Sequence, residues 1–281
     1  MKELMLVVKN NLMMPILATE DRISEISNEA ILHASPTVIN GLFLMLVSYI
    51  ESMHKSVLIY YLKYQPESIP VKKTIEIDKI ILADNEDFYL VEHLVSEFVR
   101  GMNYPQFADL FYKTLRIKKP DNEAIIGEIK KKRNEVIHKN LRVHFKHKKS
   151  EHEHIDSNYL AYSLNEYTMY LNGLKTEISN RYADCTKLNA LRNMWDYTFT
   201  TPLCANFEDY WYVDTENDSI VGCKTSNNEG SLSSSERFIL DIWKSQVSGC
   251  KVDFTNISSL GQHMQHCLYT FLKLSNDIFM Y

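Results

Sequence analysis

An arginine, an asparagine and a histidine stand close together in the basic stretch KKKRNEVIHKN, as Arg133, Asn134 and His138. The arginine supplies a permanently charged, planar fork that suits a phosphate group, and a histidine titrates near neutral pH. The asparagine amide can donate and accept hydrogen bonds beside them. Together these side chains suit a phosphate ester whose reaction requires proton transfer.

One helix from Asn122 to Leu141 is expected to carry these three side chains. The apolar stripe of this helix calls for an apolar residue near position 133, where the chain has Arg133 instead, and a guanidinium there is costly without a partner or a ligand. At about 100° per residue, Arg133 and His138 lie about 140° apart around the helix, so only the long arginine side chain can bend back toward the imidazole. The apolar residues that recur at helical steps are Ile125, Ile126, Ile129, Val136 and Ile137.

The motif Arg133-Asn134-x-x-x-His138 resembles that of the HEPN-domain ribonucleases, in which an arginine, often followed by asparagine, precedes a histidine by a few residues. It lies late in a helical region, after a long apolar helix with one acid, which is similar to the prokaryotic toxin and phage-defence members of that family. The resemblance covers roughly residues 18–184, and we find no family for the remainder. It implies an antiparallel helical bundle that cleaves RNA without metal or cofactor.

The resemblance also implies a role for each residue of the motif. Arg133 would hold the scissile phosphate and His138 would act as general acid or base. Asn134 would position the phosphate or orient His138. The sites of this family are usually formed across a dimer, with two motif helices facing each other. A homodimer would supply the second histidine that simultaneous acid and base catalysis requires.

Glu51 is the fourth candidate site residue. It lies in a helix expected from Asn40 to Tyr64, where Ser48, Glu51 and Lys55 form a polar stripe. In one interpretation the stripe is a solvated edge of the helix. In the other, which follows the resemblance, Glu51 contacts Arg133 and fixes the orientation of its guanidinium.

Positive charge is concentrated around the motif. Residues 130–149 include nine Lys or Arg and one acid, a charge of +8, whereas the whole chain carries −5 and the rest therefore −13. A basic run in an acidic protein indicates an anionic partner held at one place, here RNA, although a solvated loop after a helix has the same composition. The candidate RNA-binding residues are Lys130, Lys131, Lys132, Lys139 and Arg142.

Four histidines follow the motif in a polar stretch rich in lysine. Imidazole binds transition metals, but these histidines have no fixed ligand spacing, so we expect no metal site. The loop is instead expected to contact the RNA backbone. The four are His144, His147, His152 and His154.

The composition predicts a cytoplasmic globular protein: 45% of the 281 residues are hydrophobic and 24% are charged. The five cysteines form no CxxC pair and are odd in number, which indicates a reduced intracellular protein. The apolar segment LMLVV near the start is too short for a signal peptide. The run from Leu42 to Ile50 is about half a membrane span, so no membrane anchor is expected.

We expect a mainly α fold in three parts. Residues 1–17 form an N-terminal arm, 18–184 a HEPN-like antiparallel helical bundle, and 185–281 a smaller accessory α+β region. In the bundle, a first helix is expected to open at Thr19, and later helices over Phe88–Met102, Pro105–Leu115 and from the cap Asp156 to about Ala183.

The accessory region should contain a hairpin and three helices, the first of them a linking helix with Leu188, Leu191, Trp195 and Phe199 at helical spacing. Tyr210–Asp214 and Ser219–Lys224 predict paired strands around a polar turn. Ser233 and Glu236 have the spacing of a capping box for a helix from Ser235 to Val247, and a last helix is expected from about Ser258 to Met280.

Two functions from different classes are open at this point. The first is a HEPN-type endoribonuclease, a toxin or antiviral-defence effector of abortive infection. The second is a helical module of the same shape that binds a protein partner or a nucleotide and cleaves nothing. Leu141 stands where toxins silenced by a nucleotidyltransferase antitoxin commonly have tyrosine, so the resemblance does not imply that control, and the C-terminal region or another antitoxin would be the regulatory partner.

Overall fold

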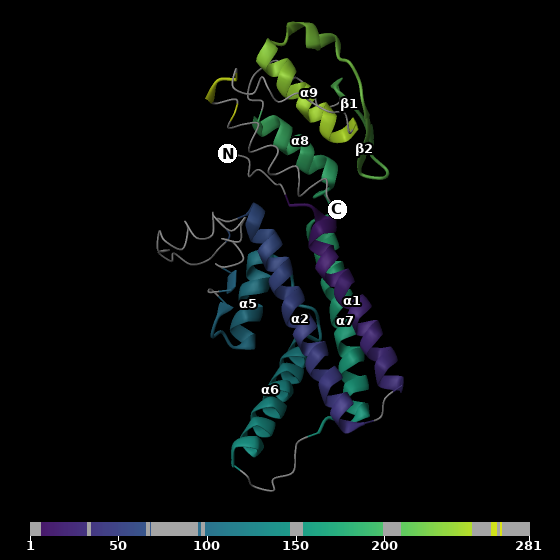
Figure 1. Ribbon diagram of the computed structural model, residues 1–281, viewed down its shortest axis with the longest axis vertical. Coiled ribbons are helices and arrows are strands. Elements are labelled where there is room, and N and C mark those ends of the chain that lie inside the picture. The colour runs from purple at the N-terminus through teal and green to yellow at the C-terminus, as the bar shows by residue number, and fades with distance from the viewer. Residues whose placement is uncertain are drawn as a thin grey trace. The chain divides into compact units, whose positions relative to one another are not determined.

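The computed structural model describes residues 7–32, 35–65, 68, 95–96, 99–146, 154–198, 209–248, 260–262 and 265. For 139–146, 194–198, 228 and 246–248 it describes the backbone alone. Over these residues the fold is mainly helical with one two-stranded sheet, which confirms the expected mainly α class (Figure 1). The chain divides into two compact units, residues 11–183 and residues 1–10 with 184–281.

The helical unit, residues 11–183, is built from five described α-helices. In Figure 1 the long helices α1, α2 and α7 run side by side, and α5 and α6 pack on α2. The helices are α1 (Lys9–Leu32), α2 (Pro36–Tyr64), α5 (Tyr104–Leu115), α6 (Glu123–Lys146) and α7 (Ser157–Arg181).

Helix α2 is central to this unit. Pro36 stands in its first turn, where a proline is tolerated because the N–H groups there have no partner within the helix. The helix is apolar on most faces, and Phe43, Leu46 and Val47 are fully buried. It contacts α5, α6 and α7, so it positions the other helices of the unit.

By length and composition, α2 is the one described helix that could span a membrane. The sequence run from Leu42 to Ile50 is too short for this, but the helix extends well beyond it on both sides. Half of its most apolar stretch of 18 residues is buried inside the protein, so its central position accounts for its apolar character.

Helix α1 begins at Lys9 rather than at Thr19, so the described part of the expected arm, residues 7–17, is largely helical. The helix continues through Pro15, which costs about 3 kcal/mol in a helix interior. One buried stripe runs on both sides of the proline, and each fully buried aliphatic side chain contributes about 1.5–3 kcal/mol, which outweighs that cost. The stripe is Leu12, Ile16, Thr19, Ile23 and Ile26.

Two of the expected helix starts are present with their caps. Asn103 and Gln106 exchange side-chain and backbone hydrogen bonds at the start of α5. The Asp156 carboxylate accepts from the Tyr159 N–H at 2.7 Å and begins α7. The expected helix Phe88–Met102 lies for the most part outside the described residues.

The second unit contains the hairpin β1 (Trp211–Asp214) and β2 (Ser219–Cys223), which pair antiparallel as expected. Its helices are α8 (Lys187–Thr198), the short 3-10 helix η3 (Asn227–Ser231) and α9 (Ser234–Ser248). At the N-terminus of the unit, the Lys9 N–H donates to the Cys185 carbonyl at 2.7 Å. The expected helix Ser258–Met280 lies almost entirely outside the described residues.

Caps fix the helix starts of this unit. Asp218, in the left-handed region at φ 50°, accepts hydrogen bonds from the backbone N–H groups of Lys187 and Leu188 at the start of α8. The predicted capping box is present, since Ser233 N–H donates to Glu236 and Glu236 N–H donates to the Ser233 hydroxyl. The hairpin turn and α8 are therefore joined by one carboxylate.

Candidate functional site

Helix α6 carries all three residues of the motif, as the periodicity predicts. It spans Glu123–Lys146, a few residues longer than expected at its C-terminal end. Ile126, Ile129 and Val136 are buried, and α6 contacts α2, α5 and α7. The apolar stripe therefore anchors the helix in the unit and fixes which side of it carries Arg133.

The Arg133 guanidinium is mostly buried and only loosely paired. Its side chain is 25% exposed, and Nη2 lies 3.6 Å from Oε2 of Glu51. Nη1 donates to the Asn134 side-chain oxygen at 2.9 Å. Nε is fully buried and has no hydrogen-bond partner among the described residues. A guanidinium has five N–H donors, so this one retains donor capacity for an anion.

The expected contact between Glu51 and Arg133 is present. The polar stripe of α2 divides at this point: Lys55 is exposed, and the Ser48 hydroxyl donates to the carbonyl of Leu44 in its own helix. Glu51 is 36% exposed and points to α6. The stripe is thus solvated at Ser48 and Lys55, and engaged in the candidate site at Glu51.

His138 and Asn134 lie on the exposed part of α6. Because α6 is one continuous helix, His138 follows Arg133 by about 7.5 Å along the axis and about 140° around it. The two side chains therefore leave the helix in different directions. The guanidinium contacts Glu51 and Asn134, and no contact between it and His138 is found among the described residues.

Lys130 is not a surface residue, contrary to the expectation that it contacts RNA. It is 6% exposed, and its Nζ lies 4.3 Å from the ring centroid of Tyr104 and 5.9 Å from that of Phe107. Burial lowers the pKa of Lys130 to about 8. The helix turns this position toward α5, whereas the neighbouring Lys131 is exposed. The side chains of Lys139 and Arg142 lie outside the described residues.

A second polar cluster lies in the core of the same unit and was not predicted. His54 Nε2 is 2.5 Å from the Tyr170 hydroxyl, which is 2.6 Å from the Tyr112 hydroxyl. We name these three residues the His54 cluster. Burial and the nearby charge of Lys130 lower the pKa of His54 well below its ordinary value. In the sequence, the only indication of the His54 cluster is a histidine on the apolar face of α2.

Metal-ligand geometry is not found in the described part of the chain, where no three His, Cys, Asp or Glu side chains converge. His154 Nδ1 accepts a hydrogen bond from the side-chain amide nitrogen of Asn40 at 2.9 Å. The other three histidines of the expected loop have no described side chain.

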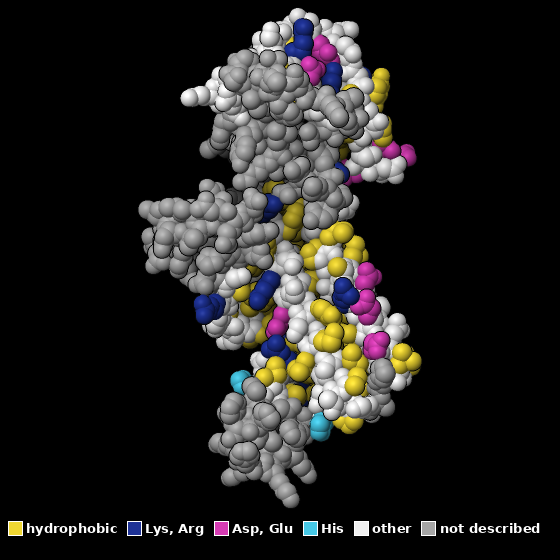
Figure 2. Space-filling model, in the orientation of Figure 1, with side chains coloured by type: hydrophobic (Ala, Val, Ile, Leu, Met, Phe, Trp, Pro, Cys, Tyr) yellow, Lys and Arg dark blue, Asp and Glu magenta, His cyan; other side chains and the backbone are white. Residues whose placement is uncertain are grey.

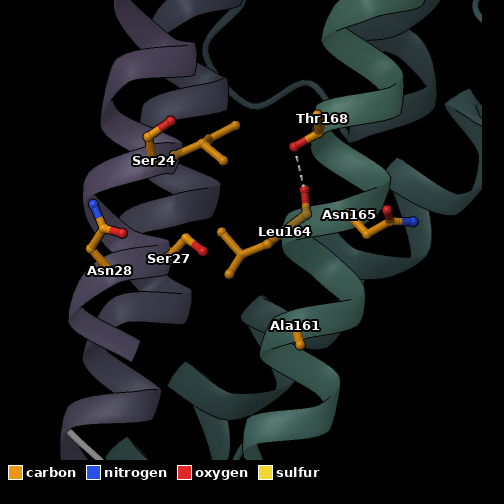
Figure 3. Close-up of a pocket in the computed structure, with 8 residues that line it drawn as sticks. Ser24, Ser27, Asn28, Ala161, Leu164, Asn165 and Thr168 are labelled. Carbon is orange, nitrogen blue, oxygen red and sulfur yellow. Dashed lines mark hydrogen bonds between the residues drawn. The ribbon is translucent and has the colours of Figure 1, made fainter. Parts of the chain in front are cut away.

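A groove of about 450 Å³ lies between α1 and α7, separate from the motif (Figure 3). Ser24, Ser27 and Asn28 line it from α1, and Asn165 and Thr168 line it from α7. Figure 2 shows hydrophobic side chains on the surface of this unit. None of the motif residues lines this groove, so it adds no group to the candidate site.

No family model, curated protein or solved structure matches this chain.

Proposed function

We propose that the protein is a metal-independent endoribonuclease of HEPN type in which Arg133 binds the scissile phosphate. The observation that supports this most is the loose environment of the guanidinium: one loose carboxylate contact, one hydrogen bond and one buried N–H that has no partner within the part of the chain that the structure describes. A phosphate oxygen pair matches the fork geometry of arginine and would satisfy N–H groups that Glu51 and Asn134 do not.

The chemistry uses the nucleophile that RNA carries. His138, as general base, removes the proton of the 2′-OH, whose oxygen attacks phosphorus while the bond from phosphorus to the 5′-oxygen breaks. A general acid protonates the leaving 5′-oxygen. Arg133 stabilises the charge that develops on the phosphate. The products are a 2′,3′-cyclic phosphate and a 5′-OH.

We propose a homodimer with a composite site for this reaction. The angle of about 140° between Arg133 and His138 around α6 separates them in one copy. A second α6 facing the first would bring one copy's histidine to the other copy's arginine, and it would supply both an acid and a base. Of the candidate RNA-binding residues, Lys131 is exposed and Lys132 is half-buried on the same helix, so Lys131 is the one whose described position favours a contact with the RNA backbone.

The test compares RNA cleavage and thermal melting for Arg133→Ala and His138→Ala. Loss of a general acid or base lowers the rate by about 10²–10⁴. We expect cleavage to be lost in both variants while the melting temperature of His138→Ala stays that of the unchanged protein, because His138 is exposed. Cleavage by both variants at the unchanged rate would refute the proposal.

The second function, a binding module that cleaves nothing, is favoured by one observation. Arg133 is three-quarters buried beside Glu51, as in a structural ion pair. Removing one partner of a buried pair costs about 3–5 kcal/mol, so this function predicts a large fall in melting temperature for Arg133→Ala and no cleavage by the unchanged protein.

A further inference from the structure

Glu51 has more than one possible partner in the core of the helical unit. Its charge acts on Lys130 and Arg133 of α6 and on Tyr167 of α7. It lies closest to Arg133, at 3.6 Å, which is longer than a charge-assisted hydrogen bond. We name Glu51, Lys130, Arg133 and Tyr167 the Glu51 cluster.

Lys130 and Tyr167 of the Glu51 cluster are buried, and neither is bonded to a carboxylate among the described residues. Tyr167 is 0% exposed, and its hydroxyl has no hydrogen-bond partner among the described residues. Lys130 is 6% exposed and forms no ion pair with any residue that the structure describes. Buried donors of this kind are costly unless some state of the protein satisfies them.

We propose that Glu51 changes partner when the site binds phosphate: it holds Arg133 in the empty site and moves to Lys130 and Tyr167 when Arg133 takes the anion. Lys130 and Tyr167 are then positioning residues that act through Glu51 and do not touch the RNA. This inference rests on the proposed function, because it assumes that Arg133 is the phosphate-binding group.

Electrostatics give the reason for the exchange. An RNA phosphate at Arg133 is repelled by a carboxylate that already contacts the guanidinium. A glutamate side chain has three rotatable bonds, and Glu51 is partly exposed, so it has room to move. The Lys130 ammonium and the Tyr167 hydroxyl are both donors, so together they can hold the carboxylate away from the phosphate.

Lys130 makes the exchange dependent on pH. Burial lowers the pKa of Lys130 to about 8, so its ammonium loses its charge well below the pH at which an exposed lysine does. Without that charge Glu51 returns to Arg133 and competes with the anion. The titratable and charged groups that face Lys130 are Glu51, His54 and Lys55 of α2, Tyr104 of α5, and Glu123 and Arg133 of α6.

The experiment measures affinity for a short 2′-O-methyl RNA, which cannot be cleaved and whose phosphodiesters keep their charge, by fluorescence anisotropy. For the unchanged protein we expect binding about tenfold tighter at about pH 7 than at about pH 9, the effect of one charge-assisted hydrogen bond. Lys130→Met should bind at both pH values as weakly as the unchanged protein does at the higher one. Tyr167→Phe should weaken binding at the lower pH.

Glu51→Gln separates the exchange from a direct attraction between Lys130 and RNA. Without the competing carboxylate, binding should be tight at both pH values. Lys131→Met is the matched control, because it removes an exposed lysine of the same helix: it should weaken binding by the same factor at both pH values and so leave the pH dependence unchanged. A pH dependence in Glu51→Gln equal to that of the unchanged protein would overturn the proposal.

Two further measurements distinguish a failure of the exchange from a folding defect and from a failure of the proposed function. Lys130→Arg retains a charge at both pH values and should bind tightly at both, which addresses a folding defect in Lys130→Met. If the unchanged protein binds no RNA, the proposed function fails. Sulfate then replaces RNA as the anion, and its binding is measured by the rise in melting temperature that it causes. If sulfate does not raise the melting temperature, or raises it equally in Arg133→Ala, the exchange is overturned as well.

Discussion

The helical unit contains two buried polar clusters that differ in how well their groups are paired. In the His54 cluster, hydrogen bonds of 2.5 and 2.6 Å join residues of α2, α7 and α5. In the Glu51 cluster, the one ion contact is 3.6 Å, and the Arg133 Nε and the Tyr167 hydroxyl have no partner among the described residues. His54 Nδ1 also has no hydrogen-bond partner among the described residues, but the two short bonds of the His54 cluster stabilise one arrangement of helices, whereas the loosely paired Glu51 cluster retains capacity for a ligand.

The largest expected effect is on the proposed RNA cleavage and concerns His138, which lies on the same helix as Arg133 of the Glu51 cluster. His138→Ala should lower the RNA cleavage rate by about 10²–10⁴ without a change in melting temperature. Lys131→Ala, at another exposed position of α6, is the control and should lower the rate far less. An equal loss in both variants would indicate a general charge effect on RNA binding.

The next effect is on stability and belongs to the His54 cluster. Tyr170→Phe removes the hydroxyl that joins His54 to Tyr112 and leaves both groups buried and unpaired, at a cost of about 1–3 kcal/mol each. Urea unfolding measures this loss, and RNA affinity should be unchanged. A variant with unchanged stability and weakened RNA binding would reverse the roles of the two clusters.

A smaller effect concerns pH and the His54 cluster. The folded protein holds His54 neutral because burial and Lys130 lower its pKa, so the unfolded chain binds a proton more readily below about pH 6.5. The free energy of unfolding should therefore fall as the pH decreases below that value. His54→Asn should show a smaller decrease between about pH 7 and about pH 5, measured by the urea midpoint, and an unchanged slope would contradict the buried neutral imidazole.

The free energy of unfolding should also depend on the titration of Lys130, in the alkaline pH range. Its pKa is about 8 in the folded protein and about 10.4 in an unfolded chain, so between these values the unfolded chain binds more protons. The free energy of unfolding should rise with pH across this range, and the rise should be absent in Lys130→Met. Equal slopes in the two proteins would show that Lys130 is solvated.

The smallest expected effect is that of chelation. The proposed reaction uses side chains and the 2′-OH of the RNA, so EDTA should leave the cleavage rate unchanged. Complete loss of cleavage with EDTA, restored by magnesium, would contradict this mechanism.

Helical periodicity predicted α6 and the side of it that is buried, and residue chemistry predicted the caps at Asp156 and Ser233. The contact of Glu51 with Arg133 was one of two interpretations that the sequence left open, and it followed from the family resemblance, because a polar stripe on a helix can equally be a solvated edge. The burial of Lys130 was not predicted, because a basic run gives no indication of which lysine the helix turns toward α5. The start of α1 was missed because Pro15 signals a boundary that the buried stripe overrides.

The most direct test of the phosphate site is RNA cleavage by Arg133→Ala and His138→Ala, each alone and then mixed after the subunits have been allowed to exchange. Each variant alone should be inactive. The mixture should cleave RNA faster than either variant alone but more slowly than the unchanged protein, with 2′,3′-cyclic phosphate and 5′-OH ends, because a mixed dimer has one intact pair of Arg133 and His138 but lacks the second histidine. Full activity of either variant alone, or an active unchanged protein whose inactive variants never recover in the mixture, would contradict a site shared between two copies.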